Sequence, residues 1–172
     1  MSRELIILRH CKSDWDNNVL QDEQRPLSQR GVHNAEVLGQ WMLKQSIVPD
    51  QVLCSTAVRA RQTLKLVNVT LTLPEDRIQF QKELYLASLS TLLRFLSEVD
   101  YSYNAVMIVG HNPGLDYLVD HISRKKPELT SSGKLMNTGC LAHFQCPDDW
   151  QTLKQCGKLL SITRPADIIE YN

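Results

Sequence analysis

The chain has 172 residues, a length that suits one domain with a core large enough to fold without disulfides or a bound metal. Its 19 basic and 19 acidic residues balance, so no overall positive charge favours nucleic acid or an anionic membrane as a partner. No apolar stretch approaches the roughly 18 residues of a membrane-spanning helix, and none near the N-terminus is long enough for a signal peptide. We therefore expect one cytoplasmic domain over residues 1–172, with any anion site confined to one place.

The first expected element is a buried strand that ends in a charged pair. Leu5 to Leu8 is an apolar run without alternation, and Arg9 and His10 follow it directly. In an open parallel α/β sheet, ligands bind beyond the carboxyl ends of the strands. Arg9 and His10 are therefore candidate site residues, although an isolated pair of this kind is also compatible with a solvated strand end.

A helix, a strand and a second helix are expected next. Ser28 is a suitable N-cap for a helix over residues 29–45, whose apolar residues recur at helical spacing. Residues 51–54 (QVLC) predict a short second strand. The helix that follows carries Arg59 in its first turn, so a guanidinium again stands just beyond a strand end.

The middle of the chain is less regular. Residues 70–86 contain a turn signal at Pro74, and residues 77–85 are compatible with a strand or an extended connection. Glu83 lies in this segment. Leucines at residues 89–96 then follow the spacing of an amphipathic helix.

The strongest strand signal covers residues 105–110, again a continuous apolar run of the kind found in strands covered on both faces. His111 follows it directly. Asn112 can serve as an N-cap and Pro113 as the first residue of the next helix. The free N–H groups at such a helix N-terminus favour an anion. Because His111 follows this strand, a third strand places a polar group at the same edge of the sheet.

The C-terminal third predicts a strand pair. Residues 123–137 are polar and predict a mobile excursion, whereas residues 140–145 and 158–163 resemble two strands joined as an antiparallel pair at one sheet edge. Residues 165–172 support no prediction. Together the elements predict a single three-layer α/β domain, in which helices flank a mixed, mostly parallel sheet.

Three strand-to-helix junctions thus offer polar groups to one crevice, and Glu83 is offered by a fourth segment. Two arginines, two histidines and a helix N-terminus suit a dianionic tetrahedral group, because a transferring phosphoryl group needs fixed donors for the charge on its oxygens. Arginine fits this work, since its planar fork stays charged and binds two oxygens together. The candidates are Arg9, His10, Arg59 and His111.

No motif for a nucleotide, a metal or another cofactor is present. The chain has no GxxxxGK[ST], no GxGxxG and no aspartate-rich metal motif, and its five cysteines form no C-x-x-C pair. A route without a metal needs a nucleophile, and a histidine can be one. An imidazole held between arginines should have a lowered pKa, which keeps its attacking nitrogen unprotonated at neutral pH.

Four segments in the same order resemble the histidine phosphatase superfamily, and within it the SixA type, the small bacterial phosphohistidine phosphatases. They are residues 8–13 (LRHCKS), 25–31 (RPLSQRG), 55–63 (STAVRARQT) and 109–113 (VGHNP). The resemblance implies a phosphoglycerate mutase-like fold without a large cap domain. It also implies a nucleophile at His10 that becomes phosphorylated, with the phosphoryl group bound by Arg9, Arg59 and His111. Arg25 would steady the mouth of the pocket, and Asn112 would add to phosphate binding.

Two departures from the family pattern affect the expected chemistry. Cys11 stands where most of the superfamily has Gly after the nucleophilic histidine. Larger relatives use a carboxylic acid to protonate an alcohol leaving group, and Glu83 alone stands at a comparable position. A phosphoramidate leaving group needs less help than an alkoxide, so a weak or absent acid favours phosphohistidine as substrate.

The leading hypothesis is a metal-independent phosphohydrolase that acts on phosphohistidine in a protein, such as a histidine phosphotransfer domain. The alternatives are a phosphomonoesterase for a small metabolite and a non-catalytic module that binds phosphate or a phosphoprotein. No cofactor, nucleic acid or membrane is expected as a partner, and a monomer is favoured.

Overall fold

The computed structural model describes residues 2–16, 19–129 and 133–169 and contains a mixed six-stranded sheet. The order across the sheet is β3-β2-β4-β1-β5-β6; the first four strands are mutually parallel, and the last two run antiparallel to their neighbours. The predicted mostly parallel sheet with an antiparallel pair at one edge is therefore confirmed. The strands are β1 (Arg3–Arg9), β2 (Gln51–Ser55), β3 (Ile78–Gln81), β4 (Ala105–Gly110), β5 (Leu141–Cys146) and β6 (Lys158–Thr163).

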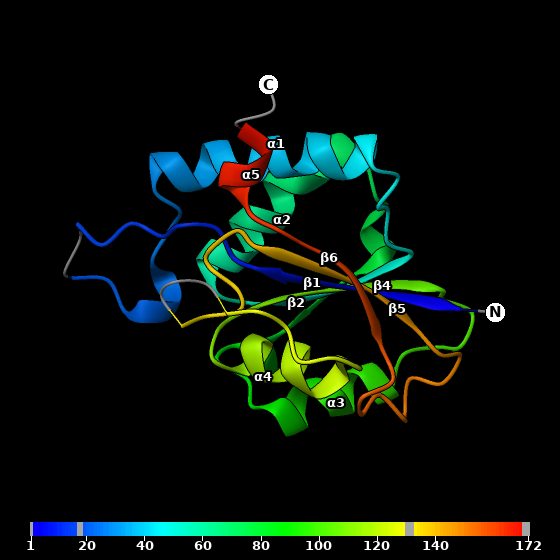
Figure 1. The fold of residues 1–172 in the computed structure, drawn as a ribbon. Coiled ribbons are helices and arrows are strands. Elements are labelled where there is room, and N and C mark those ends of the chain that lie inside the picture. The colour runs from blue at the N-terminus through cyan, green and yellow to red at the C-terminus, as the bar shows by residue number, and fades with distance from the viewer. Residues whose placement is uncertain (1, 17–18, 130–132, 170–172) are drawn as a thin grey trace.

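Helices cover both faces of this sheet, which gives the three layers expected (Figure 1). One face carries α1 (Gln29–Lys44), α2 (Val58–Leu71) and α5 (Pro165–Ile169), and the opposite face carries α3 (Leu89–Ser97) and α4 (Gly114–Ile122). Short 3-10 turns lie in the connections: η1 (Asp22–Gln24), η2 (Glu75–Arg77) and η3 (Lys82–Leu84).

The uninterrupted apolar run of β1 is explained by this double covering. Leu5 and Ile7 belong to the core under α3 and α4, whereas Ile6 and Leu8 belong to the core under α1 and α2, and all four side chains are fully buried. Each such side chain contributes about 1.5–3 kcal/mol by leaving water. The two cores therefore fix the strand firmly, and its C-terminal end is held in place for Arg9 and His10.

Of the two helix starts predicted from capping signals, one is confirmed and one is wrong. Ser28 accepts a hydrogen bond from the Gly31 N–H, as predicted, and α1 ends at Lys44. The fourth helix begins at Gly114, so the prediction of Asn112 as N-cap and Pro113 as first helical residue is wrong. The Asn112 amide instead donates to the carbonyl oxygen of Met136, and the Asn112–Pro113 peptide bond is cis.

The predicted mobile excursion over residues 123–137 is wrong at Leu135 and Met136. Leu135 and Met136 are buried, and both of their backbone N–H groups donate to the carboxylate of Asp116 on α4. Two apolar side chains inside a polar stretch are sufficient to fix it against the core. Residues 130–132, at the centre of the stretch, lie outside the described residues.

No helix among the described residues is both long and apolar enough to cross a bilayer.

Candidate active site

The carboxyl ends of three adjacent strands bring the predicted residues together. Arg9 at the end of β1 is in register with Gly110 at the end of β4, and β4 also pairs with β2, so all three strands open at one edge. His10 and His111 follow β1 and β4 there, with ring centroids 5.1 Å apart. Arg59 reaches the same place from the first turn of α2. These side chains line a cavity of about 750 Å³.

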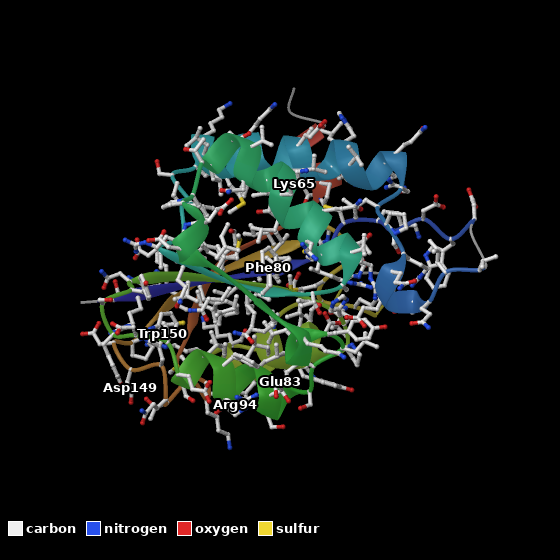
Figure 2. The ribbon with its side chains drawn as sticks, turned by 180° about the vertical axis from the view of Figure 1, so that it is seen from behind. Lys65, Phe80, Glu83, Arg94, Asp149 and Trp150 are labelled. Atoms are coloured by element: carbon white, nitrogen blue, oxygen red, sulfur yellow. The ribbon has the colours of Figure 1, made fainter. Side chains whose placement is uncertain are left out.

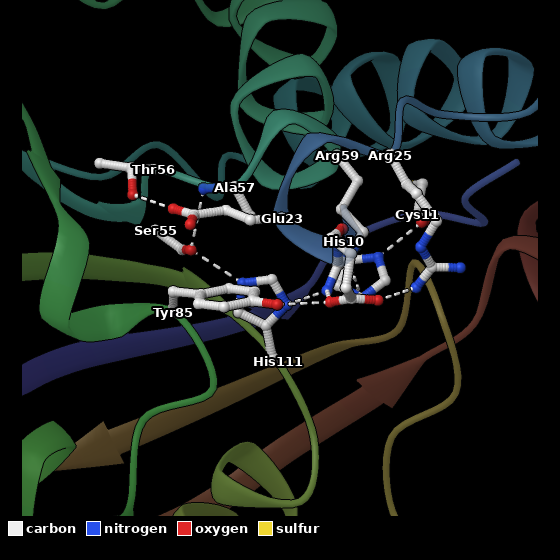
Figure 3. Close-up of polar contacts among 11 residues, drawn as sticks. His10, Cys11, Glu23, Arg25, Ser55, Thr56, Ala57, Arg59, Tyr85 and His111 are labelled. Carbon is white, nitrogen blue, oxygen red and sulfur yellow. Dashed lines mark hydrogen bonds and ion pairs between the residues drawn. The ribbon is translucent and has the colours of Figure 1, made fainter. Parts of the chain in front are cut away.

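His10 lines this cavity. Figure 3 shows the hydrogen bonds that its two ring nitrogens make. Its Nδ1 lies 2.7 Å from the carbonyl oxygen of Cys11, which can only accept, so Nδ1 carries the proton. Its Nε2 accepts a hydrogen bond from Arg59 Nε at 3.3 Å. Burial is the main cause that lowers the pKa of His10 to about 4, and Arg59 and Arg9 add to it. The predicted lowering is found, although burial outweighs the arginines.

His111 is held in one tautomer by two neighbours. Arg59 Nη2 lies 3.4 Å from His111 Nδ1, and because a guanidinium only donates, Nδ1 is the accepting nitrogen. The opposite nitrogen, Nε2, then donates to the buried hydroxyl oxygen of Ser55 at 2.8 Å. Burial first, and then the charges of His10 and Arg59, lower the pKa of His111 to about 3. The imidazole is therefore neutral and fixed.

The two predicted arginine clamps differ in how their donors are used. Arg9 Nη1 donates to the carbonyl oxygen of Met136 at 2.8 Å, and its buried Nε has no partner among the described residues. Arg59 is only 3% exposed and uses all three of its nitrogens, since beyond His10 and His111 it binds the backbone oxygen and the carboxylate of Asp22. Arg9 thus has a free donor, whereas the donors of Arg59 are all in use.

Asp22, which the sequence analysis did not select, occupies the centre of the site. Its carboxylate on η1 pairs with Arg59 at 2.9 Å and with Arg25, and it accepts a hydrogen bond from the Tyr85 hydroxyl. Burial opposes ionisation, but the bonds from Tyr85, Arg59 and Arg25 outweigh it and hold the pKa of Asp22 well below its usual range. An internal carboxylate therefore lies where an anion was expected.

Tyr85 was also missed. Its ring meets that of His111 edge to face, with centroids 5.4 Å apart. It comes from the irregular connection after η3, where no periodicity marks a residue as inward-facing. The sequence did offer one sign of Asp22, since it lies three residues before Arg25. A carboxylate repels an anion, however, so a search for an anion site passes over it.

Arg25 and Asn112, which the family resemblance implied as further site residues, both line the cavity. Arg25 is 8% exposed, and its guanidinium carbon lies 3.4 Å above the centre of the Trp15 ring. Its Nη1 is buried without a partner among the described residues. Asn112 uses its amide nitrogen on Met136, while its amide oxygen has no such partner. Both positions therefore retain unused polar atoms next to the site.

Glu83 does not line the cavity, which contradicts its prediction as a site residue. Its carboxylate is 65% exposed and pairs with Arg94 of α3 at 2.7 Å, on the outside of the molecule (Figure 2). The turn η3 is the reason, because it buries Leu84 in the core and leaves its preceding residue outside. The side chain from this connection that reaches the site is Tyr85.

Cys11 is a buried structural thiol. Burial raises its pKa to about 12, and its backbone N–H donates to the Thr63 hydroxyl at 3.0 Å. The thiolate is the reactive form of cysteine, so this sulfur is inert. Among residues 2–16, 19–129 and 133–169, no three His, Cys, Asp or Glu side chains are grouped so that they could hold a metal ion.

Comparisons with known proteins identify relatives of this chain. A sequence model described as the histidine phosphatase superfamily (branch 1) matches residues 5–87. An uncharacterized chloroplastic protein of Arabidopsis thaliana is 31% identical over 154 residues, covering 84% of this chain and 68% of the relative. The phosphohistidine phosphatase SixA of Escherichia coli is 26% identical over 132 residues, 75% of this chain and 81% of SixA. The chain spans 63% of the length of the Mycobacterium tuberculosis relatives it matches.

Solved structures show the same fold. The protein histidine phosphatase SixA complexed with tungstate superimposes with a TM-score of 0.79 at 23% identity, over 96% of this chain and 99% of that one. The alpha-ribazole phosphatase of Shigella flexneri gives a TM-score of 0.67 at 17% identity, over 94% and 96% of the two chains. The sequence matches and this shared fold show that the chain belongs to the histidine phosphatase superfamily.

Proposed function

We propose that this protein is a metal-independent phosphohydrolase that removes phosphate from phosphohistidine in a protein, through a phosphohistidine formed on its own His10. The observation that carries the proposal is the tautomer of His10. Its Nδ1 is fixed by the Cys11 carbonyl, so the Nε2 lone pair faces the cavity and the guanidinium of Arg59. A neutral imidazole whose unprotonated nitrogen lies beside cationic donors is prepared to attack a phosphorus atom.

The reaction balances in two steps. In the first, His10 Nε2 forms a bond to phosphorus, the P–N bond of the substrate breaks, and the departing imidazole takes up a proton from solvent. In the second, water attacks the phosphorylated His10, which releases inorganic phosphate and restores the imidazole. The free donor of Arg9 would match the charge on the equatorial oxygens in both steps, and Arg59 and His111 would add to it by exchanging their hydrogen bonds to Asp22 and Ser55 for the phosphoryl oxygens. The free Nη1 of Arg25 would donate to the remaining oxygen, and Asn112 would do so with its amide nitrogen, in exchange for its hydrogen bond to Met136.

The only carboxylate that lines the cavity among the described residues supports phosphohistidine over a phosphate ester. Asp22 is held ionised at neutral pH by Tyr85, Arg59 and Arg25, so it has no proton to give. An alkoxide leaving group needs such a proton, whereas an imidazole leaving group protonates readily by itself. A histidine phosphotransfer domain would be a suitable partner.

A labelling experiment tests the covalent step. Wild-type protein is mixed briefly with a ³²P-labelled phosphohistidine protein and quenched in alkali, and the bound label is tested for acid lability. We expect a label that is stable in alkali and lost in acid, with none on a His10→Ala variant. Wild-type protein that stays unlabelled but binds phosphate saturably would be a binding module. Labelling that is faster from a small phosphate ester would contradict the proposed substrate alone.

A further inference from the structure

The cavity is far more basic than the chain as a whole. Among the described residues, seven lysines and arginines line it and Asp22 is the single carboxylate there, although the whole chain carries 19 basic and 19 acidic residues. Arg9, Arg25 and Arg59 surround the two histidines and suffice for one phosphoryl group. The remaining basic residues lie outside that group and are Lys12, Arg30, Lys134 and Arg164.

Three of these outer residues converge from separate parts of the fold, and we call them the basic rim: Lys12, Arg30 and Arg164. Lys12 lies in the loop after β1, Arg30 in the first turn of α1, and Arg164 just after β6. Clustered like charges repel one another, so such a set costs stability unless a counter-anion binds. The presence of three such positive charges around one cavity therefore indicates a role in binding an anion.

The donors of the basic rim are largely unused. Lys12 and Arg30 are exposed, and no carboxylate among the described residues pairs with either. Arg164 approaches Asp167 only at 3.9 Å, and its buried Nε has no partner within the described ranges. Next to them, the almost fully buried Arg25 also keeps an unpartnered Nη1. Unused buried donors of this kind indicate that the cavity is built for more anionic oxygen than the protein supplies.

The cavity has room for more than a phosphoryl group, and its edge carries a residue suited to a protein contact. Its volume of about 750 Å³ far exceeds that of a phosphoryl group, given roughly 30 Å³ for one water molecule. Trp15 lines its edge and is 63% exposed, with Arg25 held against its ring. An exposed tryptophan beside cations is typical of the residues that anchor protein–protein interfaces.

We propose that the basic rim is a second anion subsite, which binds carboxylates on an acidic protein surface surrounding the phosphohistidine while Trp15 contacts the same surface. This inference rests on the proposed function, and it names the chemistry of the substrate around the phosphoryl group. Carboxylates that pair with the basic rim would speed the encounter of the substrate protein with this protein and would fix the orientation of its phosphohistidine. A small phosphoramidate has no such carboxylates, so it would gain neither effect.

Matched peptides test the basic rim. The substrates are phosphohistidine peptides flanked on both sides by glutamates or by glutamines, with phosphoramidate as a small reference. We expect wild-type kcat/KM to be at least about tenfold higher for the acidic peptide at low salt, with the preference lost at about 500 mM salt. The Lys12→Glu/Arg30→Glu variant should lose the preference at low salt and hydrolyse phosphoramidate at the wild-type rate.

A second variant controls for net charge. Lys44→Glu/Lys158→Glu makes the same charge change at exposed residues that do not line the cavity, so it should keep the peptide preference. Equal hydrolysis of both peptides by the wild type would overturn the basic rim and leave the proposed function standing. Hydrolysis of neither peptide nor phosphoramidate would overturn both. Loss of phosphoramidate turnover in the Lys12→Glu/Arg30→Glu variant would place these residues at the phosphoryl site and contradict a separate subsite.

Discussion

The chemistry of the site depends on which nitrogen of His10 carries the proton. The Cys11 carbonyl fixes that proton on Nδ1, and the buried position, with Arg59 at 3.3 Å, keeps Nε2 free of a second one. Protonation of Nε2 would bring a positive charge next to a guanidinium away from water, which is strongly unfavourable. The nucleophile is thus kept reactive by position alone, without a neighbouring base.

We predict that phosphorylation of His10 keeps its rate until the pH falls toward 4. The reactive fraction of imidazole follows the pKa of His10, which burial chiefly lowers to about 4, so the rate should not decline through the ordinary histidine value of 6.5. Rapid-quench measurement of labelled His10 between about pH 8 and pH 4 checks this, with an enzyme-free blank for acid hydrolysis of the donor. A midpoint near pH 6.5 would contradict it.

We predict that Glu83→Gln leaves turnover of both phosphoramidate and a phosphate ester within about twofold of wild type. The exposed carboxylate of Glu83 pairs with Arg94 and does not line the cavity. Glu98→Gln is the matched control, since Glu98 pairs with the same arginine. A selective loss of ester hydrolysis in Glu83→Gln alone would make this residue the acid after all.

The residues that could be predicted are those that follow strands directly. An apolar run fixes where a parallel strand ends, so His10 and His111 had only one edge to occupy. The direction of Glu83, Tyr85 and Asp22 depends instead on single turns of 3-10 helix, where a rotation by one residue exchanges inside for outside. No periodic pattern in the sequence indicates that rotation. For this reason Glu83 was predicted to face the site, whereas Tyr85 is the residue that does so.

At the scale of elements, the N-terminus of α1 supports the loop that carries the nucleophile. The Lys12 carbonyl oxygen accepts hydrogen bonds from the N–H and the hydroxyl of Ser28, which caps α1. Gly31, one turn further, has its Cα against the same carbonyl, and a Cβ there would overlap it. The position of Cys11, and with it the tautomer of His10, is therefore tied to the packing of α1.

We predict that Gly31→Ala lowers both stability and rate. Forcing a methyl group against the Lys12 carbonyl should cost about 1–3 kcal/mol, which corresponds to a fall in Tm of roughly 5 °C. The displaced loop should slow phosphorylation of His10 about tenfold, because small shifts of a nucleophile are costly. Calorimetry and the labelling assay measure the two effects. Glu36→Ala, at an exposed position of α1, should change neither; a Gly31→Ala variant that matches it would refute the contact.

At the scale of the whole molecule, two apolar cores determine the fold and one polar edge determines the site. The alternating burial of β1 between the two cores explains why run length and helix spacing predicted the three layers from sequence. The strand order could not be predicted this way, since any of several orders would bury the same residues. That residues 1–172 form one cytoplasmic, monomeric domain stays a prediction.

We predict that the protein loses stability as the pH falls from 6.5 to 5. Burial chiefly lowers the pKa of His10 to about 4 and of His111 to about 3, so the unfolded chain takes up protons there that the folded protein does not. Each histidine should cost about 1–2 kcal/mol over this interval. Chemical denaturation at both pH values tests it. His111→Gln should reduce the loss, and His33→Gln, an exposed position, should not; equal losses in all three proteins would disprove the assignment.

The carboxylate of Asp22 also bears on how a turnover ends. Inorganic phosphate left on Arg59 and Arg25 competes with a carboxylate that is tethered beside them and ionised. A tethered competitor acts at a high effective concentration, so it should hasten product release and keep product inhibition weak. We predict that Asp22→Asn lowers the inhibition constant of inorganic phosphate about tenfold, measured in steady-state assays; an unchanged constant would rule this out. The carboxylate of Asp22 would then displace the product phosphate from Arg59 and Arg25 after each turnover.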